Sequence, residues 1–436
     1  MQRSALLALT LALAAPRRLG QDTVCAPARY DARMKSQWTC LVFAAVGFAS
    51  HAAELHGALD LRASASTRGG IRDGGLGKLR SGGSTLGSGQ AVLAADSDLS
   101  DNLSAQVELS ADSDHAGVLD IRSAVLTWSP LPSDAWKTRV RAGFFFPPSS
   151  VEIAYGAPGW LPARTISSAA VNSWIGEEIR TQGIEWSTRR LGRFAGSAYD
   201  VGLVAAVFNH NDPAGTLLAW RGWSISDRIA GRNEARRLPD LPVYRPDGPI
   251  PRQSGLLRPF REIDGRLGYY VGAELVLPER AQLAALHYDN RADALAVQDG
   301  QYGWHTRFDL ATLTLQPGRG WTVLAQALHG DTLMGARAVA LDFEAVYVLV
   351  SHRLGAGTAS ARYDRFQTRE HDLLPADPNN ETGHGLAVAW ALPLTDQWSW
   401  LSEALFINST RAARRLVGQP ARLSEHSVTT ALRFEF

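Results

Sequence analysis

Short segments in which apolar and polar residues alternate run from residue 54 to the end of the chain. In NLSAQVELSA (residues 102–111), every second residue is leucine, alanine or valine, and serine, glutamine and glutamate fill most of the places between them. A strict period of two is typical of a β-strand whose two faces meet different surroundings. This pattern predicts about sixteen strands, at 54–64, 88–98, 102–111, 118–129, 136–146, 178–188, 196–208, 263–277, 281–291, 305–315, 321–331, 339–353, 357–367, 382–393, 398–410 and 425–436.

The connections between these segments fall into two sizes. Short turns such as LSD, PLPSD, PER, LGA and LTDQ alternate with longer connections, above all 147–177 and 209–262. Bacterial membrane barrels have an even number of strands, short turns at one end and long loops at the other. Tryptophan supports the same interpretation, because aromatic belts mark membrane interfaces. The tryptophans that flank the short turns are Trp128, Trp136, Trp186, Trp321, Trp398 and Trp400.

The last strand, SVTTALRFEF, ends on Phe436, and its apolar parity runs from Val428 to that residue. In a soluble sandwich, an exposed aromatic residue on a terminal strand would be a liability at the sheet edge. In a membrane barrel the apolar face meets lipid and the polar face meets a wet lumen. We therefore expect an all-β fold: a closed transmembrane antiparallel β-barrel of about 16 strands, with a long loop folded into the lumen. Charges on the polar parity, such as Asp342, Glu344, Arg362 and Asp364, are expected to face that lumen.

The N-terminal region contains two export-like segments. We expect residues 1–33 to be read-through or a leader extension, 34–53 to be a signal peptide cleaved after Ala52 or Ala53, and 54–436 to form the barrel. The alternative for 1–33 is one long leader. Both cysteines, Cys25 and Cys40, lie in the part that would be removed, as suits an oxidising periplasm.

The overall charge is nearly balanced, with 44 Lys+Arg against 43 Asp+Glu. A balanced chain has no bulk field to attract nucleic acid, so any electrostatic function must be local. No segment offers a convincing Ser/His/carboxylate set, and we expect no enzymatic activity, no cofactor and no metal site. The acidic turns at 96–98 and 112–115 and the loop EHDLLPADPNNE (370–381) are open to two interpretations, a divalent-cation site or a solvated acidic loop.

Several stretches carry a family resemblance. VTTALRFEF resembles the terminal signature by which outer-membrane barrels of Gram-negative bacteria are recognised for assembly. RAGFFFPPSSVEIAYGAPGWLPARTISSAAVNSWIGEEIRTQGIEW and PFREIDGRLGYYVGAELV resemble porin-like proteins close to the phosphate-selective porins O and P, and the resemblance covers nearly all of 54–436. It implies an outer-membrane porin for passive diffusion of small hydrophilic solutes or ions, embedded among lipid and lipopolysaccharide as a homotrimer. The lysine ladders of phosphate-selective porins are missing, because only Lys78 and Lys137 remain after processing.

In porins, the loop at the place of 147–177 folds into the lumen and narrows it. Here it carries Glu152, Glu177 and Glu178, and neighbouring strands carry a basic strip that we define as Arg122, Lys137, Arg139, Arg141 and Arg180. If the acids face this strip, a transverse field would screen ions at the constriction. The alternatives are that these charges pair with one another and hold the loop, or that the loop lies on the outer surface.

Two other functions remain open at this stage. A lipid hydrolase would need a serine and a histidine on the outer parity near one rim; His287 and His426 both fall on strands, without an evident serine partner. A surface receptor or adhesin would use the loop 209–262, which is rich in proline and arginine.

Overall fold

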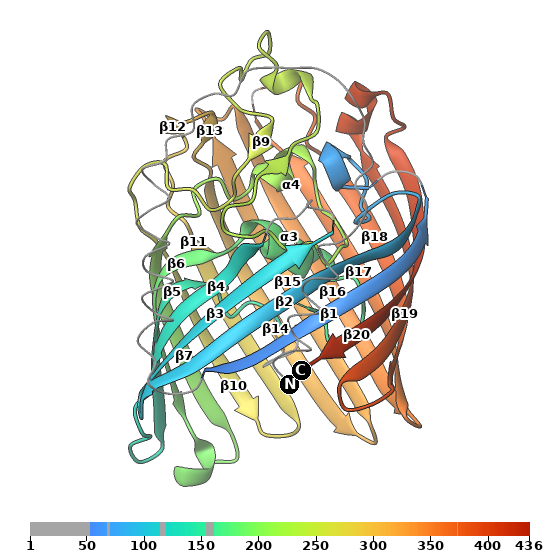
Figure 1. The fold of residues 1–436 in the computed structure, drawn as a ribbon. Coiled ribbons are helices and arrows are strands. Elements are labelled where there is room, and N and C mark those ends of the chain that lie inside the picture. The colour runs from blue at the N-terminus through green and yellow to red at the C-terminus, as the bar shows by residue number, and fades with distance from the viewer. Residues whose placement is uncertain (1–52, 68–69, 114–118, 154–160, 373) are drawn as a thin grey trace.

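A computed structural model describes residues 53–67, 70–113, 119–153, 161–372 and 374–436, so the predicted leader, apart from Ala53, lies outside the described residues. Sixteen antiparallel strands form one closed barrel (Figure 1). The barrel closes where the last strand pairs with the first, from Ala58 opposite Glu435 to Ser66 opposite Ser427. The predicted fold is confirmed, and each of the sixteen predicted segments overlaps one strand of the barrel.

In order around the barrel, the strands are β1 (Glu54–Ser66), β2 (Ser84–Ser100), β3 (Leu103–Asp112), β4 (Asp120–Trp128), β5 (Trp136–Phe145), β6 (Thr181–Arg190), β7 (Asp200–Asn209), β10 (Gly268–Leu277), β11 (Ala281–Asp289), β14 (His305–Gly318), β15 (Trp321–Met334), β16 (Val339–Leu354), β17 (Gly357–Glu370), β18 (Glu381–Pro393), β19 (Trp398–Arg411) and β20 (Arg422–Glu435).

The remaining elements lie in the connections. They are η1 (Arg72–Gly74), α3 (Ala170–Glu178), η2 (Gly192–Phe194), α4 (Thr216–Trp220), β8 (Arg236–Arg237), η3 (Pro242–Tyr244), β9 (Leu256–Leu257), β12 (Val297–Gln298), β13 (Gln301–Tyr302) and η4 (Ala412–Val417). The pairs β8–β9 and β12–β13 form two small sheets of their own. None of the described helices is long and apolar enough to span a membrane.

The two ends of the barrel differ, as the connection lengths predict (Figure 1). At one end, here called the turn end, short connections join β2 to β3, β10 to β11, β14 to β15, β16 to β17 and β18 to β19. At the other, the loop end, lie the long connections 146–180 and 210–267. Five of the predicted belt tryptophans are exposed by 42–47% of their surface: Trp128, Trp136, Trp186, Trp321 and Trp400.

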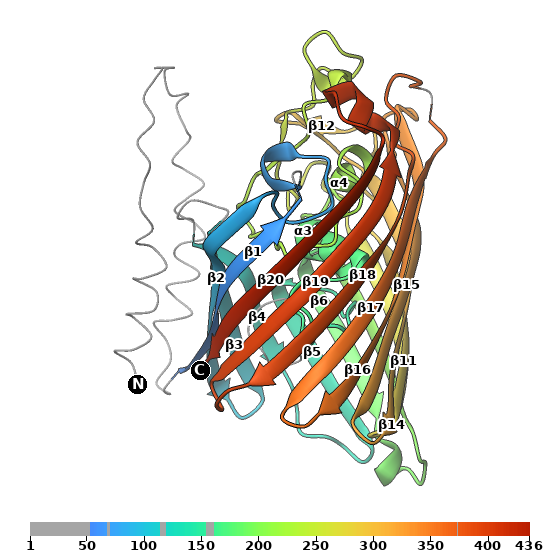
Figure 2. The ribbon, with the colours of Figure 1, turned by 90° about the vertical axis from the view of Figure 1, so that its right-hand side faces the viewer.

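The two long connections fill much of the barrel interior, where α3 and α4 lie inside its outline in both views (Figures 1 and 2). Because they cover the inner face of the wall, that face is apolar on some strands. On β16, Phe343, Tyr347 and Leu349 are buried, whereas Asp342 and Glu344 stay partly exposed on the opposite parity. The prediction that Asp342 and Glu344 face the lumen is therefore wrong. Arg362 and Asp364 on β17 do point inward and are fully buried.

Candidate functional site in the barrel lumen

The connection between β5 and β6, residues 146–180, is here called the first inserted loop. All nine residues of α3 are buried. Trp174 packs edge-on against Phe308 of β14 and Phe343 of β16, with ring centroids 5.5 and 5.1 Å apart. This helix therefore lies inside the barrel, as predicted, and the alternative of an outward surface loop is wrong for it.

Glu152 attaches the first inserted loop to the wall. Its carboxylate lies 2.6 Å from Arg362 Nη1 of β17 and accepts hydrogen bonds from the backbone N–H of Ala169, at the N-cap of α3, and from Asn172 Nδ2. Burial raises the pKa of Glu152, and the Arg362 guanidinium opposes that rise. Arg362 also pairs with Asp364 at 2.8 Å, so one buried arginine holds two buried acids.

The two acids at the end of α3 join the first inserted loop to the second. Glu177 lies 2.6 Å from Arg221, which holds the pKa of Glu177 below its usual range against the effect of burial. Glu178 accepts hydrogen bonds from Trp174 Nε1 at 2.6 Å and from the backbone N–H of Leu217 in α4 at 2.8 Å. Burial raises the pKa of Glu178 to about 7.

The connection between β7 and β10, residues 210–267, is here called the second inserted loop. Its segment 211–231 is buried throughout. Trp220 packs against Trp304 with ring centroids 5.1 Å apart, and the backbone N–H of Trp223 donates to Glu381 of β18 at 3.0 Å. Asp227 lies 2.6 Å from Arg62 of β1 on the opposite wall. This loop therefore reaches across the lumen.

Sequence reasoning assigned 209–262 to the surface and missed this insertion. The signal was present in LLAWRGWSI (217–225), because two tryptophans and four aliphatic residues in nine positions need cover that a surface loop cannot provide. Because the segment 217–225 is buried, it cannot form part of a binding surface for a receptor or adhesin.

Two residues of the basic strip are buried beside each other. Arg180 Nη1 donates to the backbone carbonyls of Arg122 and Ala230, at 3.1 and 2.8 Å, and its guanidinium stacks on the Phe146 ring at 3.8 Å. Burial and the neighbouring Arg122 hold the pKa of Arg180 well below its usual range. Within the described residues, Nε and Nη1 of Arg122 and Nε of Arg180 have no hydrogen-bond partner.

The other strip residues lie nearer the turn end, on β5. Arg141 forms a two-bond pair with Glu185 of β6, at 2.7 and 2.6 Å. The side chain of Arg139 is 46% exposed and lies 3.6 Å from the same carboxylate, and Lys137 is exposed. The turn-end part of the lumen is thus polar and open to water on these strands.

The structure does not place the loop acids against the strip. Glu152 pairs with Arg362 and Glu177 with Arg221, while Glu178 bonds a tryptophan and a backbone amide. Arg139 and Arg141 instead share Glu185, a strand acid that sequence reasoning did not single out. All eight predicted residues lie in or beside the lumen, and whether they line a solute path stays a prediction.

The acidic turns and the acidic loop that the sequence offered as cation sites do not come together in one site. Asp98 is exposed, Glu381 is buried against Lys78 and Arg411, and residues 114–115 lie outside the described residues. Carboxylate oxygens of Asp212, Glu262 and Asp264 lie within 4.8 Å of one another at the loop end. Burial and the neighbouring carboxylates of Glu262 and Asp264 raise the pKa of Asp212 to about 7.

No family model matches the sequence, and a search of curated proteins found no match. Solved structures do share the fold. The outer membrane channel DcaP of Acinetobacter baumannii is 11% identical over 88% of this chain and 97% of its own, with a TM-score of 0.51. The anion-selective porin from Comamonas acidovorans is 11% identical over 88% of this chain and 99% of its own, with a TM-score of 0.50. These likenesses confirm the porin-like barrel, and nothing in them singles out phosphate-selective porins.

Proposed function

We propose that this protein is a porin of the Gram-negative outer membrane through which small hydrophilic solutes or ions diffuse passively. The observation that carries the proposal is the division of the barrel wall. On β5 the lumen-facing Lys137, Arg139 and Arg141 are charged, while alternate residues of neighbouring strands, such as Ile184 and Val207, expose apolar side chains outward. A wet lumen inside an apolar outer band is the arrangement of membrane channels. The two structural neighbours, described as a channel and a porin, support it.

The two inserted loops form the constriction in this proposal. They are fixed to the wall by buried ion pairs, Glu152 with Arg362 and Asp227 with Arg62, so the narrow region is held rather than free. Solutes that cross the constriction pass Lys137 and Arg139 on its turn-end side, and the buried pair Arg122 and Arg180 lies behind these two residues. Because a charge near a narrow, poorly hydrated passage acts strongly on a passing ion, this excess of arginine favours anions.

Two further features belong to the proposal. The turn end faces the periplasm and the loop end faces outward among lipid and lipopolysaccharide, because bacterial barrels carry their long loops outside. The protein assembles as a homotrimer.

The rival functions find little support. His287 pairs with Asp309 at 2.8 Å. In the part of the chain that the structure describes, no serine hydroxyl bonds the imidazole of His287 or His426. A serine hydrolase needs a serine within hydrogen-bond reach of a histidine that acts as its base, and neither histidine has one.

Liposome swelling tests the proposal. Vesicles that contain the folded, purified barrel should swell in iso-osmotic solutions of small sugars, with rates that fall as the sugar becomes larger. Vesicles that contain the barrel but swell no faster than protein-free vesicles for any sugar would contradict it.

A further inference from the structure

The inner face of β3 is less covered than that of any other barrel strand. Every other strand of the barrel contains buried residues, whereas all ten residues of β3 are only half-buried. The polar side chains of β3 point into the lumen, because Glu108 lies 4.0 Å from Arg122 and Asp112 lies 2.5 Å from Arg80. The side chains of Glu108 and Asp112 keep 12% and 15% of their surface exposed. Water therefore reaches this face from the lumen.

The first inserted loop is attached to the opposite side of the barrel. Its helix α3 packs against β15, β16 and β17. Asn172 Nδ2 donates to Gln326 of β15 at 2.8 Å, and the backbone N–H of Ala170 donates to Asp364 of β17 at 3.0 Å. In the ring of sixteen strands, β15 is eight strands away from β3 in either direction. The loop thus covers the wall that faces β3 across the lumen.

Arg80, in the connection between β1 and β2, bridges the second inserted loop to β3. Its Nη2 lies 2.5 Å from Asp112 of β3, and its Nη1 lies 3.0 Å from Asp227 of that loop. The side chain of Arg80 is partly exposed, like that of Asp112. This contact between the loop and β3 is therefore polar and borders on water.

The uncovered surface continues from β3 onto the neighbouring strands toward the turn end. On β2, Asp96 is partly exposed and accepts a hydrogen bond from Gln106 Nε2 of β3 at 2.9 Å. On β5, Arg139 and Arg141 are also partly exposed. Carboxylates and guanidinium groups thus follow one another along this part of the wall. From the loop end to the turn end, the partly exposed charged residues are Arg80, Asp112, Glu108, Asp96, Arg141 and Arg139.

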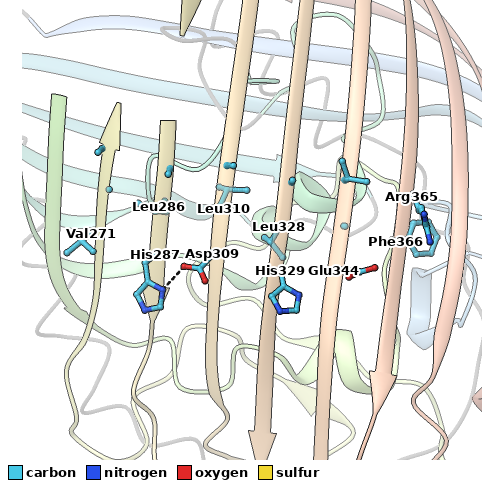
Figure 3. Close-up of a pocket in the computed structure, with 17 residues that line it drawn as sticks. Val271, Leu286, His287, Asp309, Leu310, Leu328, His329, Glu344, Arg365 and Phe366 are labelled. Carbon is cyan, nitrogen blue, oxygen red and sulfur yellow. Dashed lines mark hydrogen bonds and ion pairs between the residues drawn. The ribbon is translucent and has the colours of Figure 1, made fainter. Parts of the chain in front are cut away.

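A depression of about 880 Å³ in the wall from β10 to β17 does not belong to this inner surface. His287, Asp309, His329 and Glu344 line it, one from each of four neighbouring strands (Figure 3). Leu310, which follows Asp309 in sequence, is buried against the lumen contents. The four polar side chains therefore point away from the lumen.

We propose that solutes cross the barrel along the inner face of β3, and that Glu108 helps to determine which ions pass. The passage is then off-centre, with β2 to β5 on one side and the inserted loops on the other. A charge beside a narrow, poorly hydrated passage acts strongly on a passing ion, so Glu108 offsets part of the attraction that the arginines exert on anions. This inference rests on the proposed channel function, and it adds the route and a residue that sets the selectivity.

Cysteine labelling tests the route. In a background of Cys25→Ser and Cys40→Ser, Ser110→Cys places a thiol on the inner face of β3. Ser360→Cys is the matched control, because Ser360 also points inward, on β17, but is only 4% exposed. A negatively charged, membrane-impermeant methanethiosulfonate should modify the first thiol in the folded barrel and spare the second, as the intact mass reports. The same reagent should lower the conductance step of Ser110→Cys alone. Modification of both thiols, or of neither, would overturn the proposed route.

Charge removal tests the role of Glu108. Glu108→Gln keeps the shape of the side chain and leaves Arg122 without this carboxylate, so the reversal potential in a salt gradient should shift toward anions. Glu344→Gln removes a carboxylate from the outer face of β16 and should leave the potential unchanged. An unchanged potential in an assembled Glu108→Gln barrel would overturn the role of Glu108.

The labelling readout separates a failure of this inference from a failure of the proposed function. The intact mass reports on access to β3 and does not require transport. A barrel that conducts while the thiol of Ser110→Cys stays unmodified would overturn the route and keep the channel. A barrel that is labelled as expected and conducts no current would overturn the channel itself, and the route with it.

Discussion

Arg362→Met should release the first inserted loop from the wall while the barrel stays folded. The guanidinium pairs with Glu152 at 2.6 Å and Asp364 at 2.8 Å, and all three side chains are fully buried. It also donates to the Ser167 carbonyl and hydroxyl, at 2.5 and 3.0 Å. Methionine fills similar space and offers no charge, so two buried carboxylates lose their common partner.

The size of the effect follows from this geometry. Removing one partner of a buried ion pair costs about 3–5 kcal/mol, because the other charge remains buried. At about 1.4 kcal/mol per factor of ten, the undocked fraction of the loop rises roughly 100-fold to several thousand-fold. The barrel keeps its strand ladder, since lumen substitutions tune selectivity rather than assembly. Because burial already raises the pKa of Glu152, acid should neutralise it in the variant and recover part of the docking.

Single-channel recording in planar bilayers measures this change. The variant should show larger and noisier conductance steps than the wild type at neutral pH, and the difference should shrink in acid. Arg422→Met, which alters an exposed arginine on β20, should match the wild type. A fully assembled Arg362→Met barrel with wild-type steps at every pH would refute the reasoning that this pair holds the constriction.

Three further predictions can be tested on the same samples. Burial raises the pKa of Glu178 to about 7, so between about pH 4.5 and 7 the docked loop binds more protons than the undocked loop, and docking should weaken as the pH rises through this window. Protease protection of the loop measures this trend, and Glu178→Gln should abolish it. A trend that persists in the variant would assign it to another group. Arg139→Gln with Arg141→Gln should shift the reversal potential toward cations, and an unchanged potential would show that these arginines serve only to hold Glu185. The chain should fractionate with the outer membrane and migrate differently on a gel before and after heating; recovery as a soluble periplasmic protein would exclude the barrel.

The strands were predictable because their two faces meet different surroundings. In β3, alanine, valine and leucine alternate with polar residues, so the period of two and the apolar face can be read from the sequence of this strand alone. The turn end was predictable for a similar reason, since short turns and tryptophans such as Trp136 and Trp321 mark it locally. The strands and the turn end can be predicted because both depend only on the local sequence and on contact with lipid.

The partners inside the lumen could not be predicted in the same way. The bond between Glu152 and Arg362 joins residues 210 positions apart, and no local pattern encodes which arginine a loop glutamate meets. The prediction of which face of β16 points to the lumen was wrong for a related reason. Sequence reasoning assumed that the polar parity always faces the lumen, but α3 makes that side apolar, and Glu344 turns outward. A wall whose inner side is covered by protein does not follow the rule that holds for a wall between lipid and water.

The most direct test of the central claim is the conductance of the wild-type protein. A barrel that is folded, as shown by its heat-dependent migration, and reconstituted in a planar bilayer should give discrete conductance steps, with a reversal potential in a salt gradient that favours anions. A folded barrel that leaves the bilayer at its protein-free background would contradict the account, because it would mean that the two inserted loops seal the lumen instead of narrowing it.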